Sequence, residues 1–485
     1  MTTKKPSLLR DYPRTDLGNA ERLTSRYSEN FRWIPAWKDW IVWKGDHWEI
    51  DKSYLFQRAE NVARALYQEA QELPDVTAEE QAAKKLAKRY ARECEGINRV
   101  KAMIELAQHR PGVSLDHMKL NAQPMLFPVL NGTIDLTTGK MRPSMRGDYL
   151  TLASRLRFDP AAKCPTWEAF LNRAMDGDKE MIAFLQRGVG YSLTGDVGEH
   201  ALFFCYGPKG KNGKSTFMTT LRNLAGAFGS MAPRKLLHQA QGDRHPTELA
   251  TLFGKRVVTC SEVPESQVFD EALIKDLTGG ERISTRHMGE DFWEYEPTHH
   301  LWLQGNYKMQ IVGTDGGIWR RVLLIPWEVS IPEEERDLQL GAKLQKELPG
   351  ILAWAVRGCL MWQKDRLVIP AKVHNASLQY RRESDMPGEF LRLFLEFEPE
   401  GRISKRGLRQ KYEQWCEDLG AKPIGAHKMS HRLKNMGCTD TTVREKVPGK
   451  VGFGPPIDGW KGVRFKSAAE IEAVRKWDPH EGWEH

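Results

Sequence analysis

Hydrophobic and polar positions recur with different periods along the chain. Residues 53–109 combine strong helix formers with many charged residues, which predicts helical hairpins with solvated faces. Two apolar stretches in residues 40–50 flank the sequence KGD at 44–46, which predicts a β-hairpin. Tight turns predict short strands in residues 129–143. The first 150 residues are therefore expected to form small α+β and helical modules.

Five tryptophans lie within residues 15–51. Aromatic side chains at this density either form the core of a compact module or stack on single-stranded bases. The core is the favoured interpretation. The helical residues 53–109 are compatible with an oligomerisation collar and equally with a plain helical domain.

Residues 202–220, LFFCYGPKGKNGKSTFMTT, combine an apolar strand, a glycine-rich loop and the start of a helix. Two predicted helices, at 165–175 and 179–195, precede them. The free backbone N–H groups of such a loop, the positive end of the helix dipole and one lysine all attract a phosphate. The stretch therefore predicts a nucleotide site.

Lys214 is expected to reach the β- and γ-phosphates, and the Ser215 hydroxyl to hold Mg²⁺. Five residues, instead of the usual four, separate Gly207 from Gly213, so the usual glycine position is Pro208. The context of strand and helix outweighs this departure. The predicted nucleotide-binding residues are Gly207, Gly210, Lys211, Asn212, Gly213, Lys214, Ser215 and Thr216.

Three later segments carry candidate catalytic groups. The β-branched strand 257–260 leads to Glu262, which could polarise the attacking water or complete the Mg²⁺ shell. Ser261 stands where many ATPases place a second acid, so direct and water-mediated metal contacts both remain open. Asn306 follows another buried strand and could hold the attacking water.

Arg320 and Arg321 precede a fourth apolar strand. Adjacent residues of an extended chain point to opposite faces, so one of the two is expected to reach a phosphate. An arginine supplied by a neighbouring subunit would stabilise the charge of the transition state.

Residues 281–297 predict a hairpin with Arg286 and His287 near its tip. Basic tips, together with Lys275 on the preceding helix, could grip successive phosphates of a DNA strand. An ordinary surface hairpin is the alternative.

The C-terminal part carries the positive charge of the chain. Residues 401–466 hold fifteen Lys/Arg against six Asp/Glu, and the whole chain has a net charge of +8. After a predicted linker at 383–390, two amphipathic helices and a two-stranded wing at 451–465 predict a winged-helix domain that binds duplex DNA. A solvated basic surface is the alternative. The predicted DNA contacts on the second helix are Lys428, His431, Arg432 and Lys434.

The order of these motifs resembles the superfamily 3 helicases, and most closely the helicase half of phage, plasmid and poxvirus-type primase-helicases. The motifs are G-x5-GKST, a strand ending in Glu, K-x-L-T-G-G-x-x-I-x-x-R, a strand followed by Asn, and WRR. The resemblance implies an AAA+-like P-loop ATPase core in an α/β fold. It also implies Mg²⁺ and ATP, a homo-hexameric ring, and 3′-to-5′ travel along single-stranded DNA.

These expectations give four domains: modules at 1–150, an ATPase core at 151–335, a helical extension at 336–384 and a winged-helix domain at 385–485. The predicted function is an ATP-dependent replicative helicase of a phage, prophage or plasmid. It would lack its own primase domain and work with a separate primase or polymerase. The alternative is a replication initiator that ATP switches between oligomeric states without processive unwinding.

The seven cysteines show no CxxC pair and no Cys/His metal-ligand spacing, and their odd number argues against a disulfide framework. The first residues lack the apolar stretch of a signal peptide, and no apolar run approaches the length of a membrane span. A cytoplasmic protein without a membrane partner is expected, in a bacterial host or its equivalent.

Overall fold

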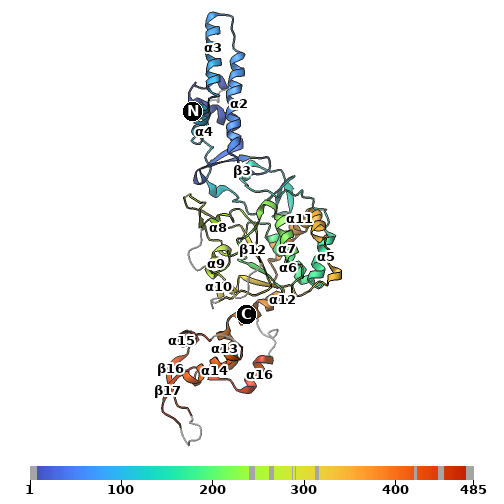
Figure 1. Ribbon diagram of the computed structural model, residues 1–485, viewed down its shortest axis with the longest axis vertical. Helices are drawn as coiled ribbons and strands as arrows, with labels where there is room; N and C mark the ends of the chain where they lie inside the picture. The colour runs from blue at the N-terminus through green and yellow to red at the C-terminus, as the bar shows by residue number, and fades with distance from the viewer. Residues whose placement is uncertain are drawn as a thin grey trace.

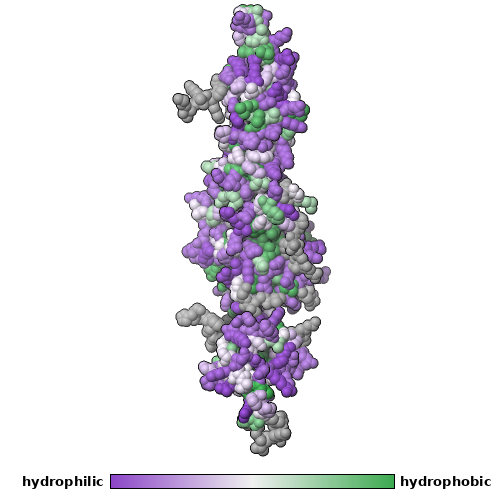
Figure 2. Space-filling view, turned by 90° about the vertical axis from the view of Figure 1, so that its left-hand side faces the viewer, coloured by the Kyte–Doolittle hydropathy of each residue, from purple (hydrophilic) through white to green (hydrophobic). Residues whose placement is uncertain are grey.

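The structure is a computed structural model that describes residues 8–239, 246–261, 267–286, 288–289, 291–311, 316–419, 423–445 and 453–476. The molecule is elongated, with a helical module at one end, an α/β body in the middle and a smaller body at the other end (Figure 1). The face in Figure 2 is mainly hydrophilic, with small separate hydrophobic patches. Within the described ranges, no helix is long and apolar enough to cross a membrane.

The N-terminal module combines a small antiparallel sheet with four helices. Trp40 and Trp48 are buried, which confirms that part of the tryptophan cluster forms a core. Trp43 pairs with Trp48 across the turn, so the predicted hairpin is confirmed. The elements are α1 (Asp16–Tyr27), β1 (Phe31–Ile34), β2 (Asp39–Trp43), β3 (Trp48–Ile50), α2 (Lys52–Gln71), α3 (Ala78–Glu93) and α4 (Ile97–Ala107).

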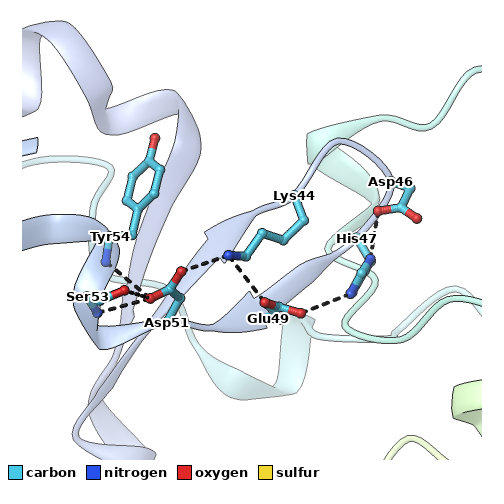
Figure 3. Close-up of polar contacts among 7 residues, drawn as sticks. All are labelled: Lys44, Asp46, His47, Glu49, Asp51, Ser53 and Tyr54. Carbon is cyan, nitrogen blue, oxygen red and sulfur yellow. Dashed lines mark hydrogen bonds and ion pairs between the residues drawn. The ribbon is translucent and has the colours of Figure 1, made fainter. Parts of the chain in front are cut away.

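The hairpin is tied to the start of α2 by a polar network (Figure 3). Asp51 caps the helix by accepting hydrogen bonds from the backbone N–H groups of Ser53 and Tyr54, at 3.0 and 3.1 Å. Its carboxylate also lies 2.7 Å from Lys44 Nζ, which contacts Glu49 at 3.2 Å. The hydrogen bond from Lys44, followed by that from Ser53, lowers the pKa of Asp51 to about 2.

The central body is built on a five-stranded parallel sheet in the order β13-β7-β12-β9-β8. Its strands are almost wholly apolar because helices cover both faces. The strands are β7 (Leu202–Tyr206), β8 (Gly229–Met231), β9 (Val257–Cys260), β12 (His300–Gly305) and β13 (Val322–Pro326).

Alternate strand residues face two different cores. Phe203 and Trp302 stack at 4.2 Å between ring centroids, in the core shared with α5 (Pro165–Ala174), α6, α7 and α11. Phe204 and Leu301 face the other core, shared with α9, α10 and α12. In Figure 1, α9 and α10 lie on the opposite side of β12 from α5, α6, α7 and α11. The helices are α6 (Lys179–Tyr191), α7 (Lys214–Ala225), α8 (Thr247–Ala250), α9 (Glu271–Gly279), α10 (Gly316–Trp319), α11 (Leu340–Asp365) and α12 (Ala371–Ser384).

Two small antiparallel units accompany the sheet. Strands β4 (Leu126–Val129), β5 (Gly132–Asp135) and β6 (Lys140–Arg142) form the predicted short strands. Strands β10 (Ile283–Thr285) and β11 (Trp293–Tyr295) pair antiparallel, which confirms the hairpin predicted in residues 281–297.

The C-terminal body packs α14 (Lys405–Asp418) and α15 (Ala426–Asn435) with a three-stranded antiparallel sheet, β15-β17-β16. The predicted wing differs in its partners, since β17 pairs with β16 and β15, whereas β18 pairs with β14. The remaining bounds are β14 (Leu395–Glu396), β15 (Arg402–Ser404), β16 (Thr439–Val443), β17 (Ile457–Lys461), β18 (Arg464–Phe465) and α16 (Ala468–Lys476).

The linker predicted at 383–390 is wrong, because α13 (Met386–Phe394) begins inside it. Asp385 caps this helix by accepting a hydrogen bond from the N–H of Gly388, and Pro387 occupies its first turn. Phe390 and Leu391 are buried in the C-terminal core. Only one residue, Asp385, therefore separates α12 from α13.

Candidate functional site

The predicted phosphate loop, residues 207–213, joins the carboxyl end of β7 to the start of α7. Gly213 has φ of +86°, and a Cβ at this position would lie 2.7 Å from the ring of Phe170. A Cβ on Gly207 would lie 2.3 Å from the backbone oxygen of Trp327 and 2.4 Å from the side-chain nitrogen of Asn212. A Cβ on Gly210 would meet nothing within 4 Å. The structure thus explains the unusual spacing, because glycine is required where the loop touches the end of β13.

Asn212 holds the loop in this position. Its Nδ2 donates to the backbone oxygens of Lys209 at 2.8 Å and Trp327 at 3.0 Å. The backbone oxygen of Lys211, which has φ of +64°, accepts from the N–H of Ile331 at 3.0 Å. The loop is therefore braced from the segment after β13, and the side-chain amide of Asn212 is engaged within it.

Lys214 lies at the centre of the site. Its Nζ is 3.0 Å from the backbone oxygen of Gly207 and 2.9 Å from Oδ1 of Asn306, and the residue is 3% exposed. Gly305 pairs with Tyr206 in neighbouring parallel strands, so the chain leaves β7 and β12 at the same edge of the sheet. This topology brings together two predicted residues that are 92 positions apart.

A cavity of about 520 Å³ opens beside the loop. Lys211, Gly213 and Thr216 line one side, and the apolar side chains of Phe170, Ile331 and Leu338 line others. Ser215 and Thr216 also border a neighbouring hollow of about 270 Å³ between α7 and α11. Sequence reasoning missed the apolar residues, because no local pattern links Phe170 or Leu338 to the loop.

Arg320 and Arg321 lie at the opposite edge of the sheet. They follow α10 in a turn and precede β13, whose first residue pairs with Leu202 at the beginning of β7. Five residues of strand span about 16 Å, which separates both arginines from the phosphate loop. The expectation that one arginine reaches a phosphate was argued for an extended chain, whereas both residues lie in a turn. Neither arginine reaches the phosphate loop of its own chain.

The two arginines also differ in their surroundings. Arg321 is 7% exposed, and its guanidinium donates to Oγ1 of Thr278 at 3.0 Å and to the backbone oxygen of Gly317 at 2.6 Å. Arg320 is exposed. Arg320 is therefore the one available to another molecule.

Some predicted residues fall outside the described ranges, namely Glu262 and His287. Ser261, the residue before Glu262, directly follows β9, and β9 pairs with β12 in the parallel sheet. Arg286 follows β10, with its guanidinium carbon 4.8 Å from the ring centre of Phe292, and Lys275 is half-buried on α9. Among the described residues, no group of three or more His, Cys, Asp or Glu could hold a metal ion.

Comparisons with known proteins point in one direction. Residues 20–176 match the family model described as D5 N terminal like, and residues 205–321 match a family of unknown function, DUF5906. The chain is 23% identical over 312 residues to the putative helicase L207/L206 of Acanthamoeba polyphaga mimivirus, covering 59% of this chain and 32% of the relative. It is 24% identical over 303 residues to the putative helicase 022R of Frog virus 3, covering 58% of this chain and 29% of the relative.

The chain is thus similar to viral proteins named putative helicases, and its N-terminal third matches the D5 N-terminal-like family. It spans about a third of the length of these curated relatives. The solved apo structure of the NrS-1 C terminal region, in its A form, superposes with a TM-score of 0.52 at 12% identity, over 90% of this chain and 98% of that one. At this identity the likeness establishes a shared fold.

On α15, the four predicted DNA contacts divide into two pairs. Lys428 and His431 are exposed. Arg432 lies 2.6 Å from Asp385, and Lys434 lies 2.8 Å from Asp440. The charges of Arg432 and Lys434 are thus partly neutralised within the chain.

Proposed function

We propose that this chain is the ATP-driven motor of a replicative DNA helicase, working on single-stranded DNA as part of a ring. The observation that carries the proposal is the position of Lys214 Nζ between the oxygens of Gly207 and Asn306. A buried ammonium at the carboxyl edge of a parallel sheet, beside a helix N-terminus, provides the charge that a triphosphate requires.

In the proposed mechanism the loop and the start of α7 hold the phosphates through backbone N–H groups. Lys214 turns from the oxygens of Gly207 and Asn306 to the β- and γ-phosphates, and the Asn306 amide orients the attacking water. The base has room in the cavity lined by Phe170 and Leu338.

Ser215, with Glu262 or with a water in place of Glu262, would hold a Mg²⁺ ion, which would supply positive charge against the phosphates. The residues fit such an ion, because Mg²⁺ in nucleotide sites needs only one or two protein ligands besides phosphate and water. Ser215 is exposed at the start of α7 and supplies one hydroxyl. Glu262 is proposed as the second group of this shell or as the residue that polarises the water.

Arg320 is proposed to complete the ATP site of a neighbouring subunit. Arg320 is exposed. The five residues of β13, at about 3.3 Å each, separate it by about 16 Å from the loop of its own chain. An arginine in that place can stabilise transition-state charge only in another subunit, which supports a ring, proposed to be a hexamer.

The C-terminal body is proposed as a winged-helix domain that binds duplex DNA, with α15 as its recognition helix. Lys428 and His431 are exposed on this helix and suit phosphate or base contacts. Because Arg432 and Lys434 are ion-paired, we expect Lys428→Ala to weaken duplex binding more than Lys434→Ala.

The motor assignment is tested by phosphate release and strand displacement from forked DNA. Lys214→Ala should abolish both, whereas Lys364→Ala, at an exposed lysine near the end of α11, should leave both unchanged. Hydrolysis by the wild-type protein without any strand displacement would favour the initiator alternative. Undiminished hydrolysis by Lys214→Ala would refute the nucleotide site itself.

A further inference from the structure

A groove of about 760 Å³ lies where the C-terminal body meets the central body. It is bordered by the last turn of α12, by α13 and by α15, and these helices lie at the junction of the two bodies in Figure 1. Four of its lining side chains are cationic, Arg381, Arg392, Arg432 and Lys466, and two are carboxylates. The lining therefore carries an excess of positive charge.

Three of these cations are held in place by neighbouring carboxylates. Arg392 lies 2.6 Å from Glu389, Arg432 lies 2.6 Å from Asp385, and Lys466 lies 3.5 Å from Glu396. A guanidinium has five N–H donors, so an arginine in such a pair can still bind a phosphate oxygen. These pairs restrict the side chains and reduce the entropy that a ligand must remove.

Arg381 is different. It is exposed on α12, lines the groove and makes no ion pair with any residue in the described part of the chain. Among the four cations of the lining, it is thus the one that no carboxylate of the described residues balances.

The wall of the groove also has an apolar part. Phe397 is half-buried and Met436 is 50% exposed, and both line the groove beside buried leucines of α13 and β14. An aromatic ring and a thioether are suitable surfaces for stacking a nucleobase. The groove therefore presents cations and a base-sized apolar surface together.

We propose that this groove binds single-stranded nucleic acid, with phosphates on the cations and a base against Phe397 and Met436. A duplex presents only its phosphates to such a groove and leaves the apolar wall without a partner. An unstacked strand satisfies both parts of the lining. The groove is distinct from the proposed duplex contacts Lys428 and His431, which do not line it.

The test measures fluorescence anisotropy of a fluorescein-labelled oligothymidylate with the full chain, in the absence of nucleotide. The logarithm of the association constant falls as the logarithm of the salt concentration rises, and each lost phosphate contact makes this slope about 0.7 less steep. At 0.1 M salt the loss of one contact corresponds to about fivefold weaker binding than that of the wild type. Arg381→Ala should show this loss. The control Arg357→Ala removes an exposed arginine of α11 that lies outside the groove lining and should bind as the wild type does.

A second measurement locates the contact. All seven native cysteines are buried, so a fluorophore can be attached selectively to the variant Met436→Cys. The emission of the fluorophore at position 436 should change when oligothymidylate is added and should not change when polyglutamate is added. The same result is expected when Lys214→Ala is also present.

Three outcomes would overturn the proposal. They are an unchanged salt slope in Arg381→Ala, an equal emission change with polyglutamate, or an equal change with a blunt duplex. Polyglutamate binding would identify the groove as a site for acidic polypeptide. Because no nucleotide is present, none of these results depends on the ATPase assignment.

Discussion

Replacing Asn306 by aspartate should change the stability of the free protein and its affinity for nucleotide in opposite directions. Oδ1 of Asn306 lies 2.9 Å from Nζ of the buried Lys214, while Asn306 itself is half-exposed. A carboxylate there converts a hydrogen bond from a charged donor to a neutral acceptor into a fully charge-assisted one. Hydrogen bonds to a charged group contribute about 1.5–3 kcal/mol, and placing the present bond at the lower end and the doubly charged bond at the upper end gives a gain of about 1.5 kcal/mol.

This gain can be expressed as a shift in melting temperature. For a unit of about 150–250 residues, 1 kcal/mol corresponds to about 2–4 °C, so the transition of the central body should rise by about 3–6 °C. Asn306→Ala removes the acceptor without adding charge, and its melting temperature should fall. The melting temperature of the wild type should therefore lie between those of Asn306→Ala and Asn306→Asp.

Nucleotide binding should respond in the opposite way to Asn306→Asp. Lys214 must leave a stronger partner before it reaches the triphosphate, which costs about 1.5 kcal/mol. The new carboxylate also repels the phosphates, by about 1 kcal/mol at 4 Å in water and more where water is excluded. A total near 3 kcal/mol weakens binding by about 10²-fold.

Differential scanning calorimetry without ligand and titration with a fluorescent ATP analogue measure the two effects. A lower melting temperature for Asn306→Asp would refute the Lys214 contact. A raised melting temperature with unchanged nucleotide affinity would show that the pair is structural and that triphosphate does not bind beside it.

Three further changes have distinct expected outcomes. Gly207→Ala places a Cβ 2.3 Å from a backbone oxygen and should abolish nucleotide binding in a titration, whereas Gly210→Ala, with open space around it, should retain binding. Asp51→Ala should cost about 1 kcal/mol at the first turn of α2, measured by hydrogen exchange. Because the hydrogen bonds from Lys44 and Ser53 lower the pKa of Asp51 from 3.8 to about 2, its contribution is complete above pH 3.8 and is lost as the pH falls towards 2, where wild type and variant should converge. Arg321→Ala should lower the free energy of unfolding by about 1–3 kcal/mol in a thermal melt, because the substitution leaves buried acceptors unpaired. Arg320→Ala should change the free energy of unfolding by less than about 0.5 kcal/mol.

Local patterns identified the parts of the site that are contiguous in sequence. The apolar run of β7, the loop and the start of α7 follow one another within twenty residues, so periodicity and glycine content suffice to predict them. The helix at Met386–Phe394 also had local signals, in the cap at Asp385 and the proline that follows, and the apolar Phe390 should have favoured a helix over a linker.

Features that depend on distant residues could not be predicted in this way. Glycine is needed at 207 because the backbone oxygen of Trp327 lies against it, 120 positions away. The ring of Phe170 enters the site from α5, a helix whose own sequence indicates only burial. The local sequence also did not reveal that a four-residue helix and a turn hold Arg320 and Arg321, so the condition of an extended chain is not met.

The parallel sheet has a consequence for assembly. Lys214 and Asn306 lie at the carboxyl edge of the strands, whereas Arg320 lies at the amino edge. If Arg320 completes the site of a neighbour, the amino edge of one subunit must meet the carboxyl edge of the next. In a two-fold symmetric contact residue i meets residue j and residue j meets residue i, so one shared surface would have to include both edges of the sheet. A head-to-tail contact needs no such shared surface, because the amino edge and the carboxyl edge each meet a different neighbour, and contacts of this kind generate closed rings or open helices.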